Sequence, residues 1–213
     1  MNKYKVLETR QLTPDCFVLK TERNGLAFQA GQCVNIGIGT GVNREYSLYS
    51  GEKDDYLEFL IRVIPNGSVS PYLQKLNPGD FVEIHGSYGL FTLRHPEDKS
   101  LKYIFIGTGT GIAPFHTYIR TYPDLDYKVI HGIRFANETY DKNHYAEKRY
   151  LSCVSRESGG DFQGRVTDYI KSIDVQEGTR IYLCGNRFMI SDIFDILIEK
   201  GHSGDHIITE AFF

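Results

Sequence analysis

The chain has 213 residues, of which 24 are Lys or Arg and 27 are Asp or Glu, so its formal net charge is −3. The charges are spread along the whole chain, which excludes both a basic nucleic-acid-binding block and an acidic disordered tail. The N-terminus lacks the apolar segment of a signal peptide, and no run reaches the roughly 18 apolar residues that a membrane span needs. We therefore expect a cytoplasmic protein that binds neither nucleic acid nor a membrane.

The first hundred residues contain short β-branched and aromatic runs separated by turn signals such as Asn24-Gly25, Asn66-Gly67 and Pro78-Gly79. This spacing predicts a small antiparallel β-barrel or sandwich. One short helix, Pro71–Leu76, interrupts the series. The predicted strands are Tyr4–Arg10, Cys16–Thr21, Gln32–Ile38, Glu45–Ser50, Tyr56–Val63 and Phe81–His85.

From Leu101 onward, strand patterns alternate with helix patterns, which predicts a parallel sheet with crossover helices. The predicted strands are Tyr103–Ile106, Lys128–Gly132, Tyr150–Val154 and Arg180–Cys184. The predicted helices are Pro114–Tyr122, Tyr145–Lys148, Val166–Ser172 and Arg187–Lys200. A polar segment with a proline, residues 94–100, separates the two patterns, so we predict domains at 1–97 and 98–213.

A glycine-rich turn follows the first strand of the second half. Gly107, Gly109 and Gly111 come directly after the apolar run Tyr103–Ile106, and Pro114 stands where a helix can begin. Glycines here allow a positive φ and let a flat or charged ligand lie against the backbone. The same turn could serve chain reversal alone.

Two segments of the first half carry side chains suited to a cofactor. Arg44 and Tyr46 share one face of an extended segment, where the first can clamp a phosphate and the second can contact a flat ring. Ser70 and Pro71 fit the N-cap and first residue of a helix, whose start can receive a phosphate. An ordinary strand with a salt-bridged arginine and a plain capped turn are the alternatives.

The second half places three arginines, Arg134, Arg156 and Arg165, behind predicted strands. Ligands of parallel sheets bind at the carboxyl ends of the strands, and arginine there favours the 2′-phosphate of NADP over the hydroxyl of NAD. Solvated arginines would give the same pattern. Cys184 ends the last apolar strand and is followed by Gly185, a pattern that core packing also explains.

No metal site is expected, because the four cysteines lie far apart without a CxxC pair. The seven histidines form no HExxH motif, and we interpret them as surface or packing residues. They are His85, His95, His116, His131, His144, His202 and His206.

Five motifs, in order, resemble those of the ferredoxin–NADP⁺ reductase family, and most closely its compact bacterial ferredoxin/flavodoxin reductases. They are Arg44–Ser47 (the RxYS flavin motif), Asn66–Pro71 (pyrophosphate), Gly107–Pro114 (nicotinamide), Val154–Glu157 with Gly164-Arg165 (the NADP phosphate) and Cys184–Asn186 with Met189. The resemblance covers essentially the whole chain. It implies an N-terminal antiparallel FAD-binding β-barrel followed by a Rossmann-like parallel α/β domain that binds NADP(H).

The resemblance also implies roles for individual residues. Those implied for FAD are Arg44, Glu45, Tyr46, Ser47, Arg62, Val63, Ser68, Val69, Ser70, Thr110, Phe212 and Phe213. Those implied for NADP(H) are Gly109, Thr110, Arg134, Ser155, Arg156, Arg165, Cys184, Gly185 and Asn186. The implied catalytic group is Ser47, Cys184, Glu210 and Phe212. The chain ends Ala211-Phe212-Phe213 where relatives often end otherwise, so a shift of one residue would put Ala211 instead of Phe212 at the isoalloxazine ring.

The implied activity is FAD-dependent hydride transfer between NADP(H) and flavin, with single electrons passing to or from a ferredoxin or flavodoxin. An NADPH:flavin reductase or the reductase component of an oxygenase is the alternative within the same class. A non-catalytic nucleotide-binding regulator is the alternative from another class. The chain carries no appended iron–sulfur module, so its partner is expected to be a separate carrier or a small acceptor.

Overall fold

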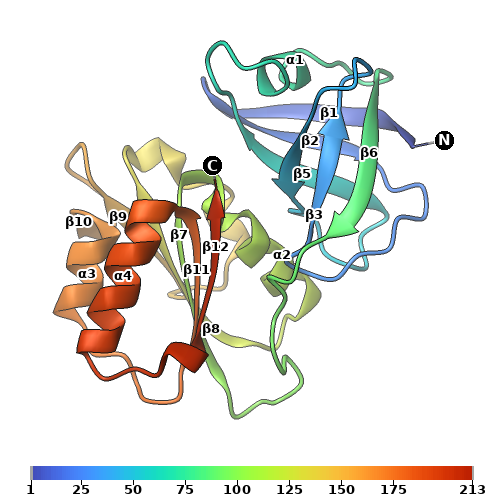
Figure 1. Cartoon of the computed structure of the whole chain (residues 1–213). Coiled ribbons are helices and arrows are strands. Elements are labelled where there is room, and N and C mark those ends of the chain that lie inside the picture. Colours follow the sequence, from blue (N-terminus) through green and yellow to red (C-terminus); the bar gives the residue numbers. More distant parts are fainter. Residues whose placement is uncertain (1, 213) are drawn as a thin grey trace. The chain divides into compact units, whose positions relative to one another are not determined.

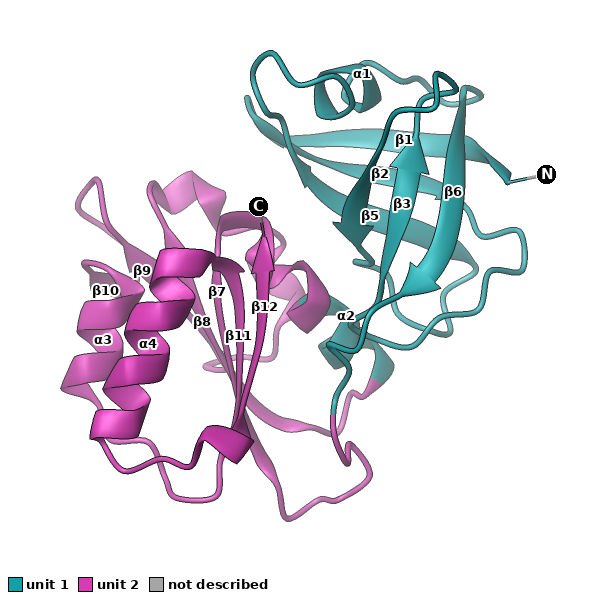
Figure 2. Cartoon of the chain, in the orientation of Figure 1, with its two compact units in different colours: residues 1–93, 116–121 teal, residues 94–115, 122–213 magenta. Residues whose placement is uncertain are grey.

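The computed structural model describes residues 2–212 of the chain. It divides into two compact units, shown in Figure 2. Unit 1 comprises Met1–Leu93 and His116–Thr121, and unit 2 comprises Arg94–Phe115 and Tyr122–Phe213. Each unit has its own six-stranded sheet.

Unit 1 is an antiparallel sheet with the strand order β4-β3-β6-β1-β2-β5. Its strands are β1 (Lys3–Thr13), β2 (Cys16–Glu22), β3 (Cys33–Gly37), β4 (Asn43–Ser47), β5 (Tyr56–Arg62) and β6 (Phe81–Tyr88). Just past β4, the Tyr49 N–H donates to the Glu58 carbonyl on the opposite edge strand β5, at 2.8 Å. The sheet therefore curls towards a barrel, and all six predicted strands are confirmed.

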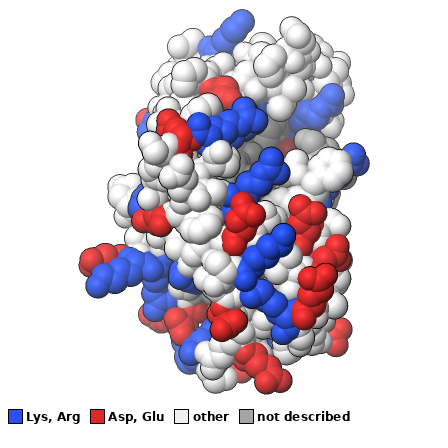
Figure 3. Space-filling view, turned by 90° about the vertical axis from the view of Figure 1, so that its left-hand side faces the viewer, with Lys and Arg blue, Asp and Glu red and all other residues white. Residues whose placement is uncertain are grey.

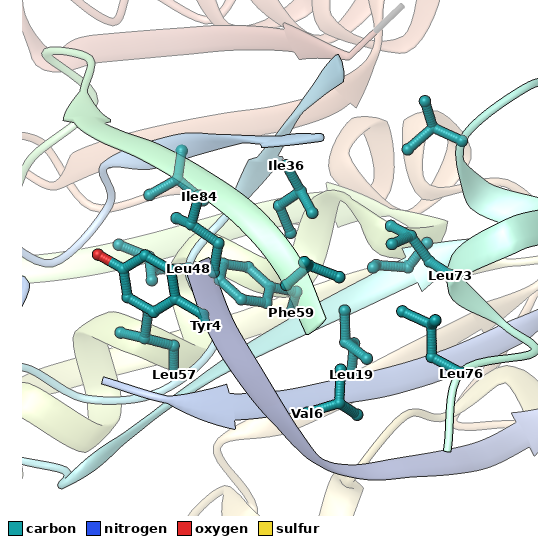
Figure 4. Packing of buried hydrophobic residues seen from close by; sticks show 14 of the residues in the cluster. Tyr4, Val6, Leu19, Ile36, Leu48, Leu57, Phe59, Leu73, Leu76 and Ile84 are labelled. Atoms are coloured by element: carbon teal, nitrogen blue, oxygen red, sulfur yellow. The ribbon is translucent and has the colours of Figure 1, made fainter. Parts of the chain in front are cut away.

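A large apolar cluster fills the inside of this curved sheet (Figure 4). Val6, Leu19, Leu57 and Phe59 belong to this cluster and have no exposed surface. The short helix α1 (Ser70–Leu73) contributes Leu73 to the same cluster. The cluster residues of β5, Leu57, Phe59 and Ile61, are two positions apart, because alternate side chains of a strand face the same side of the sheet.

The second half of helix α2 (Ala113–Thr121) belongs to unit 1. His116 Nδ1 lies 2.6 Å from the Tyr49 carbonyl, and the two rings stack with centroids 3.7 Å apart. Thr117 Oγ1 donates to the Leu48 carbonyl at 2.5 Å. Side chains of α2 therefore satisfy carbonyl groups of the non-repetitive chain that follows β4.

Arg120, near the end of α2, forms a two-point ion pair within unit 1. Its Nε and Nη2 each donate to one carboxylate oxygen of Asp54 at 3.0 Å, and Nη2 also donates to the Tyr56 hydroxyl. Both side chains are about three-quarters buried, so we expect Arg120→Ala to lower the free energy of unfolding by about 1–2 kcal/mol. Thermal unfolding measures this loss, and an unchanged melting temperature would contradict it. Lys53→Ala, at an exposed position of the same unit, is the control.

Unit 2 is a parallel sheet with the strand order β10-β9-β8-β7-β11-β12. Its strands are β7 (Lys102–Thr108), β8 (Asp126–Ile133), β9 (Tyr150–Val154), β10 (Phe162–Gln163), β11 (Arg180–Asn186) and β12 (Ile207–Phe212). Helices α3 (Val166–Ser172) and α4 (Arg187–Glu199) cover one face of the sheet in Figure 1. Between them and the sheet lies a second apolar cluster that includes Ile106, Leu183 and Ile193.

Short 3₁₀ segments complete unit 2: η1 (Gly109–Ile112), η2 (Ala136–Glu138), η3 (Lys142–His144) and η4 (Gly204–His206). From β7 the chain proceeds outward through β8, β9 and β10 on one side, and β11 and β12 lie on the other side. The strand order therefore reverses between β7 and β11. In open parallel sheets, ligands bind outside the carboxyl ends of the strands at such a switch point.

Two local predictions were wrong, and two strands were missed. Residues 145–148 form no helix, because η3 ends at His144 and Lys148 adopts a left-handed φ of 64°. Ser70 is the first residue of α1 and Val69 is the N-cap, so the helix begins one residue before the prediction and ends at Leu73. The Ser70 hydroxyl accepts a hydrogen bond from the Ile64 N–H and does not cap the helix. Strands β10 and β12 were not predicted.

None of the helices within residues 2–212 combines the length and apolar character needed to cross a lipid bilayer. Nor do these residues contain a cluster of His, Cys, Asp or Glu suited to hold a metal ion. On the face shown in Figure 3, basic and acidic side chains lie among one another.

Candidate functional site

Edge strand β4 presents the first group of predicted site residues. Tyr46 pairs with Val34 and Arg44 with Ile36 on β3, so both side chains lie on the same face. Tyr46 is half-buried against the barrel core, and burial raises its pKa to about 12, so the phenol stays protonated at neutral pH. Arg44 is exposed and donates to the Asn43 carbonyl at 2.7 Å. It has no ion pair with another residue that the structure describes, so its charge is available to an anion.

The neighbouring positions point the other way. Glu45 is exposed and pairs with Asn35, whereas Ser47 is buried and pairs with Cys33 at the end of β4. The sequence motif thus places one cation, one phenol and one buried hydroxyl within four residues.

Arg62, at the end of β5, is already engaged. Its Nη2 donates to Asp15 Oδ2 at 2.7 Å. Burial alone would raise the Asp15 pKa, but hydrogen bonds from Thr13 and Arg62 hold it below its ordinary value. The adjacent Val63 is half-buried against the barrel core, and its N–H donates to the Asp15 carbonyl at 2.8 Å. These contacts fix the backbone at residues 62–63.

The loop before α1 carries the third group. The Gly67 N–H donates to the Ile64 carbonyl at 2.9 Å, and Asn66 adopts a left-handed φ of 63°. Ser68 is exposed and Val69 is buried. With the Ser70 hydroxyl bound to the Ile64 N–H, the loop is a closed turn from which Ser68 projects.

In unit 2, the carboxyl ends of β7 and β11 meet at the switch point. Gly107 pairs with Cys184, and the Asn186 N–H donates to Thr108 Oγ1 at 3.0 Å. A Cβ on Gly111 would lie 2.5 Å from the Cys184 carbonyl oxygen, and one on Gly185 would lie 2.5 Å from Thr108 Oγ1. Both positions therefore require glycine for the turn after β7 to pack on the end of β11.

Strand β12 brings the predicted terminal residues to the same edge. Glu210 pairs with Cys184, and Phe212 pairs with Asn186, so all four lie on one face of the sheet. Ala211 is exposed and faces the other way, opposite Gly185. Phe213 lies outside the described residues.

Cys184 is a buried, neutral thiol. It has no exposed surface, and burial together with the nearby Glu210 carboxylate raises its pKa well above the ordinary value. Burial likewise raises the pKa of Cys153 to about 12. A thiol must be deprotonated to act as a nucleophile, so neither group reacts readily.

This burial predicts selective alkylation. Native protein treated with iodoacetamide at pH 8 is expected to be modified at Cys33, which is half-buried, and to be protected at Cys16, Cys153 and Cys184, which are buried. Peptide mass spectrometry reads out each site. Modification of Cys184 at the rate of Cys33 would show that the end of β11 is open.

The three predicted arginines follow neighbouring strand ends. Arg134 comes after β8, Arg156 after β9 and Arg165 after β10. The Arg156 N–H donates to the Arg134 carbonyl at 3.0 Å, and the Gly164 N–H donates to the Val154 carbonyl at 2.8 Å, which holds the three loops together. All three side chains are exposed. Within residues 2–212 none of their guanidinium groups forms an ion pair.

Two other residues at this edge have structural bonds. Ser155 donates its hydroxyl to the Ile133 carbonyl at 3.0 Å. Asn186 is the N-cap of α4, because its side-chain oxygen accepts from the N–H groups of Phe188 and Met189. This capping role was not predicted, although an asparagine directly before a helix is the usual signal for it.

His131 and Tyr150 were not predicted as site residues. His131 is fully buried on β8, where its Nε2 lies 2.8 Å from the Gly109 carbonyl and its Nδ1 lies 2.7 Å from the Tyr150 hydroxyl. A histidine inside the apolar strand 128–133 is the only signal for this arrangement in the sequence.

Arg44, Glu45, Tyr46, Ser47, Arg62, Val63, Ser68, Val69 and Ser70 thus lie in unit 1. Gly109, Thr110, Arg134, Ser155, Arg156, Arg165, Cys184, Gly185, Asn186, Glu210 and Phe212 lie in unit 2. Within unit 2 they fall into two groups, one at the ends of β7, β11 and β12 and one at the ends of β8, β9 and β10.

Comparison with known proteins assigns this architecture. Residues 5–93 match the oxidoreductase FAD-binding domain, and residues 105–195 match the oxidoreductase NAD-binding domain. A flavodoxin/ferredoxin–NADP reductase from Escherichia coli is 30% identical over 88% of this chain and 86% of its own length. A ferredoxin–NADP reductase from Pseudomonas aeruginosa is 30% identical over 98% of this chain and 96% of its own.

The chain belongs to the ferredoxin–NADP reductase family. Among solved structures, a cytochrome P450 reductase from Amycolatopsis matches 99% of this chain and 69% of its own, with 28% identity and a TM-score of 0.88. A ferredoxin–NADP⁺ reductase from Neisseria gonorrhoeae, determined with bound FAD and NADP, has the same fold with a TM-score of 0.89 at 24% identity, over 99% of this chain and 98% of its own. This reductase is therefore a flavin-dependent oxidoreductase with domains for FAD and for NADP(H), and the family implied by its sequence motifs is confirmed.

The residues present fit both cofactors. In the FAD-binding domain, Arg44 is exposed and not engaged in an ion pair, next to the half-buried ring of Tyr46. In the NAD-binding domain, three exposed arginines at adjacent strand ends suit a phosphorylated ribose.

Proposed function

We propose that this chain is a ferredoxin/flavodoxin–NADP reductase that uses FAD to pass electrons between NADP(H) and a small electron carrier in the cytoplasm. When bound, FAD exchanges a hydride with the nicotinamide and single electrons with the carrier. The three exposed arginines at the ends of β8, β9 and β10, which form no ion pair within residues 2–212, carry the proposal most strongly, because they match the phosphate that distinguishes NADP from NAD.

In unit 1, Arg44 binds the FAD pyrophosphate with its guanidinium, and the loop 66–70 adds the backbone and hydroxyl of Ser68 and the backbone of Val69 and Ser70. Tyr46 lies against the isoalloxazine, since its ring is held half-buried by the barrel core. Ser47 would lie near the flavin nitrogen that takes part in hydride transfer. The backbone at Arg62 and Val63, fixed by Asp15, lines the flavin.

In unit 2, the glycine turn with Gly109 and Thr110 receives the nicotinamide end of NADP(H), beside Cys184 and Gly185. Arg134, Arg156 and Arg165, with Ser155, bind the adenosine end. Cys184 remains a neutral thiol beside the nicotinamide, which its raised pKa supports. Glu210 lies directly opposite on β12 and completes this polar edge.

We place Phe212, and not Ala211, at the isoalloxazine ring. Phe212 shares its sheet face with Cys184 and Glu210, whereas Ala211 faces away. Phe212 then has to yield before nicotinamide reaches the flavin, and its ring raises the selectivity for the tighter-binding NADP(H).

Replacing Phe212 with Ser is expected to raise kcat/KM with NADH by about tenfold, because a ligand that must displace no ring needs about 1.4 kcal/mol less binding energy. Steady-state assays with ferricyanide as acceptor measure the change, and Ala211→Ser is the control. An unchanged NADPH/NADH ratio together with an unchanged flavin spectrum would argue against this placement.

The carrier is tested by comparing acceptors. NADPH-dependent reduction of a ferredoxin and of a flavodoxin, each coupled to cytochrome c, is expected to exceed the rate without carrier. A protein that purifies colourless and instead turns over added free flavin would be a flavin reductase. One that acts only with an oxygenase would be its reductase component, a class to which 28–33% identical relatives belong. No turnover of NADPH with ferricyanide would leave only a nucleotide-binding regulator.

A further inference from the structure

A series of hydrogen bonds through the buried His131 ends at the half-buried glycine turn. His131 lies on β8, directly beside Gly107 of β7 and Ser152 of β9. It has no exposed surface, and the rings of Tyr140 and Tyr150 lie 5.9 Å from its own. The series runs from the Tyr150 hydroxyl through both nitrogens of His131 to the Gly109 carbonyl.

The partners of His131 fix its protonation. A carbonyl can only accept, so Nε2 carries the hydrogen and donates to Gly109. Burial lowers the His131 pKa to about 4, so the ring is neutral at pH 7 and Nδ1 carries no hydrogen. Nδ1 therefore accepts from the Tyr150 hydroxyl, whose own pKa is raised by burial and which stays protonated. One tautomer and one direction of donation satisfy all three groups.

This bond orients one peptide of the turn. The peptide between Gly109 and Thr110 is trans, so its C=O and N–H point in opposite directions. With the carbonyl held on His131, the Thr110 N–H is directed away from the sheet interior. Gly109 adopts a left-handed φ of 54°. Glycine populates positive and negative φ about equally, so the residue itself does not hold the backbone in this conformation. The His131 contact thus supplies an anchor that the glycine itself lacks.

We propose that His131 and Tyr150 are positioning residues: through the Gly109 carbonyl they set the orientation of the Gly109–Thr110 peptide against which NADP(H) binds for hydride transfer. The role in hydride transfer rests on the proposed function, and the anchoring of the turn does not. Neither side chain contacts the cofactor in this scheme, so both act through the backbone of the turn.

Three variants separate positioning from packing. His131→Leu removes the donor, His131→Gln keeps an amide donor at about the Nε2 position, and Tyr150→Phe removes only the hydroxyl. Tyr169→Phe is the matched control, because it removes a tyrosine hydroxyl that accepts from Lys128 at 3.3 Å on the same unit, away from the turn. For each holoenzyme we would measure FAD content, melting temperature, the rate of flavin reduction by NADPH in stopped flow, and amide hydrogen exchange of peptides spanning residues 105–113.

We expect His131→Leu to slow flavin reduction about tenfold at saturating NADPH, as loss of one well-placed buried hydrogen bond predicts. Exchange across 105–113 should accelerate while FAD content is retained. The rate of flavin reduction in His131→Gln should be close to that of wild type. The rate in Tyr150→Phe should lie between those of His131→Leu and wild type, and the rate in Tyr169→Phe should equal that of wild type. The proposal is overturned if His131→Leu leaves both the rate of flavin reduction and the amide exchange unchanged. It is also overturned if His131→Gln slows flavin reduction as much as His131→Leu does.

If His131→Leu does not fold, Tyr150→Phe tests the proposal instead, because this variant keeps the aromatic ring and removes only the hydroxyl. Equal exchange and equal rates in Tyr150→Phe and Tyr169→Phe would overturn the proposal. If NADPH does not reduce the flavin bound to the wild-type protein, the proposed function is contradicted. Altered exchange in the His131 and Tyr150 variants would still establish the anchoring of the turn.

Discussion

Replacing both Arg156 and Arg165 with alanine is expected to raise the Michaelis constant for NADPH about 100-fold. Each arginine follows the carboxyl end of a neighbouring strand and has no ion pair within residues 2–212. A charge-assisted hydrogen bond contributes about 1.5–3 kcal/mol, so two of them account for at least the roughly 2.7 kcal/mol of a 100-fold change. Steady-state kinetics with ferricyanide measure the effect.

NADH lacks the 2′-phosphate, so its Michaelis constant is expected to stay within about twofold of wild type. Lys53→Ala/Lys171→Ala removes two positive charges at exposed positions elsewhere and controls for a general loss of charge. If the double arginine variant binds NADPH as tightly as wild type, the 2′-phosphate does not lie at these strand ends. An equal loss for NADPH and NADH would show that the arginines act on a part common to both.

Gly111→Ala is expected to slow flavin reduction by NADPH about 100-fold. A Cβ at residue 111 would lie 2.5 Å from the Cys184 carbonyl oxygen and 2.7 Å from the Gly185 Cα, and both are backbone atoms that no rotamer change can move. The turn after β7 must therefore shift away from the end of β11. Displacement of reacting groups by about 1 Å is enough to cost about 100-fold in rate.

The control for this prediction is Gly204→Ala. Gly204 also has no left-handed φ, and the nearest atoms to an added Cβ lie at 3.7 and 3.9 Å, which is ordinary contact. Stopped-flow reduction with equal FAD content isolates the effect on the nicotinamide side. A Gly111→Ala enzyme with the wild-type rate would mean that the turn is not where hydride transfer is organised.

The barrel strands could be predicted because they are short β-branched and aromatic runs bounded by turn signals such as Asn24-Gly25 and Pro78-Gly79. The parallel strands of the second half could be predicted because each is a short apolar run that ends at glycine, serine or arginine. Short elements without such a pattern were predicted wrongly or were missed. Residues 145–148 look helical by composition but form no helix. The two-residue strand β10 is placed by long-range contacts, namely its pairing with β9 and the packing of Phe162 on the Tyr169 ring.

The terminal strand β12 shows what tertiary pairing adds. Chain ends are normally frayed, so the sequence of Glu210–Phe212 alone does not predict a strand. In the structure it pairs in register with Cys184–Asn186, which brings residues from two distant segments to one face. The contact of His131 with Gly109 likewise joins residues 22 positions apart. A single sequence contains no pattern that predicts the pairing of β12 with β11 or the contact of His131 with Gly109.

The most direct measurement is an anaerobic titration of the purified protein, followed by its visible spectrum. We expect a yellow protein whose flavin absorption bleaches with about one equivalent of NADPH per FAD, and far more slowly with NADH. A protein with bound flavin that NADPH leaves oxidised would contradict this expectation.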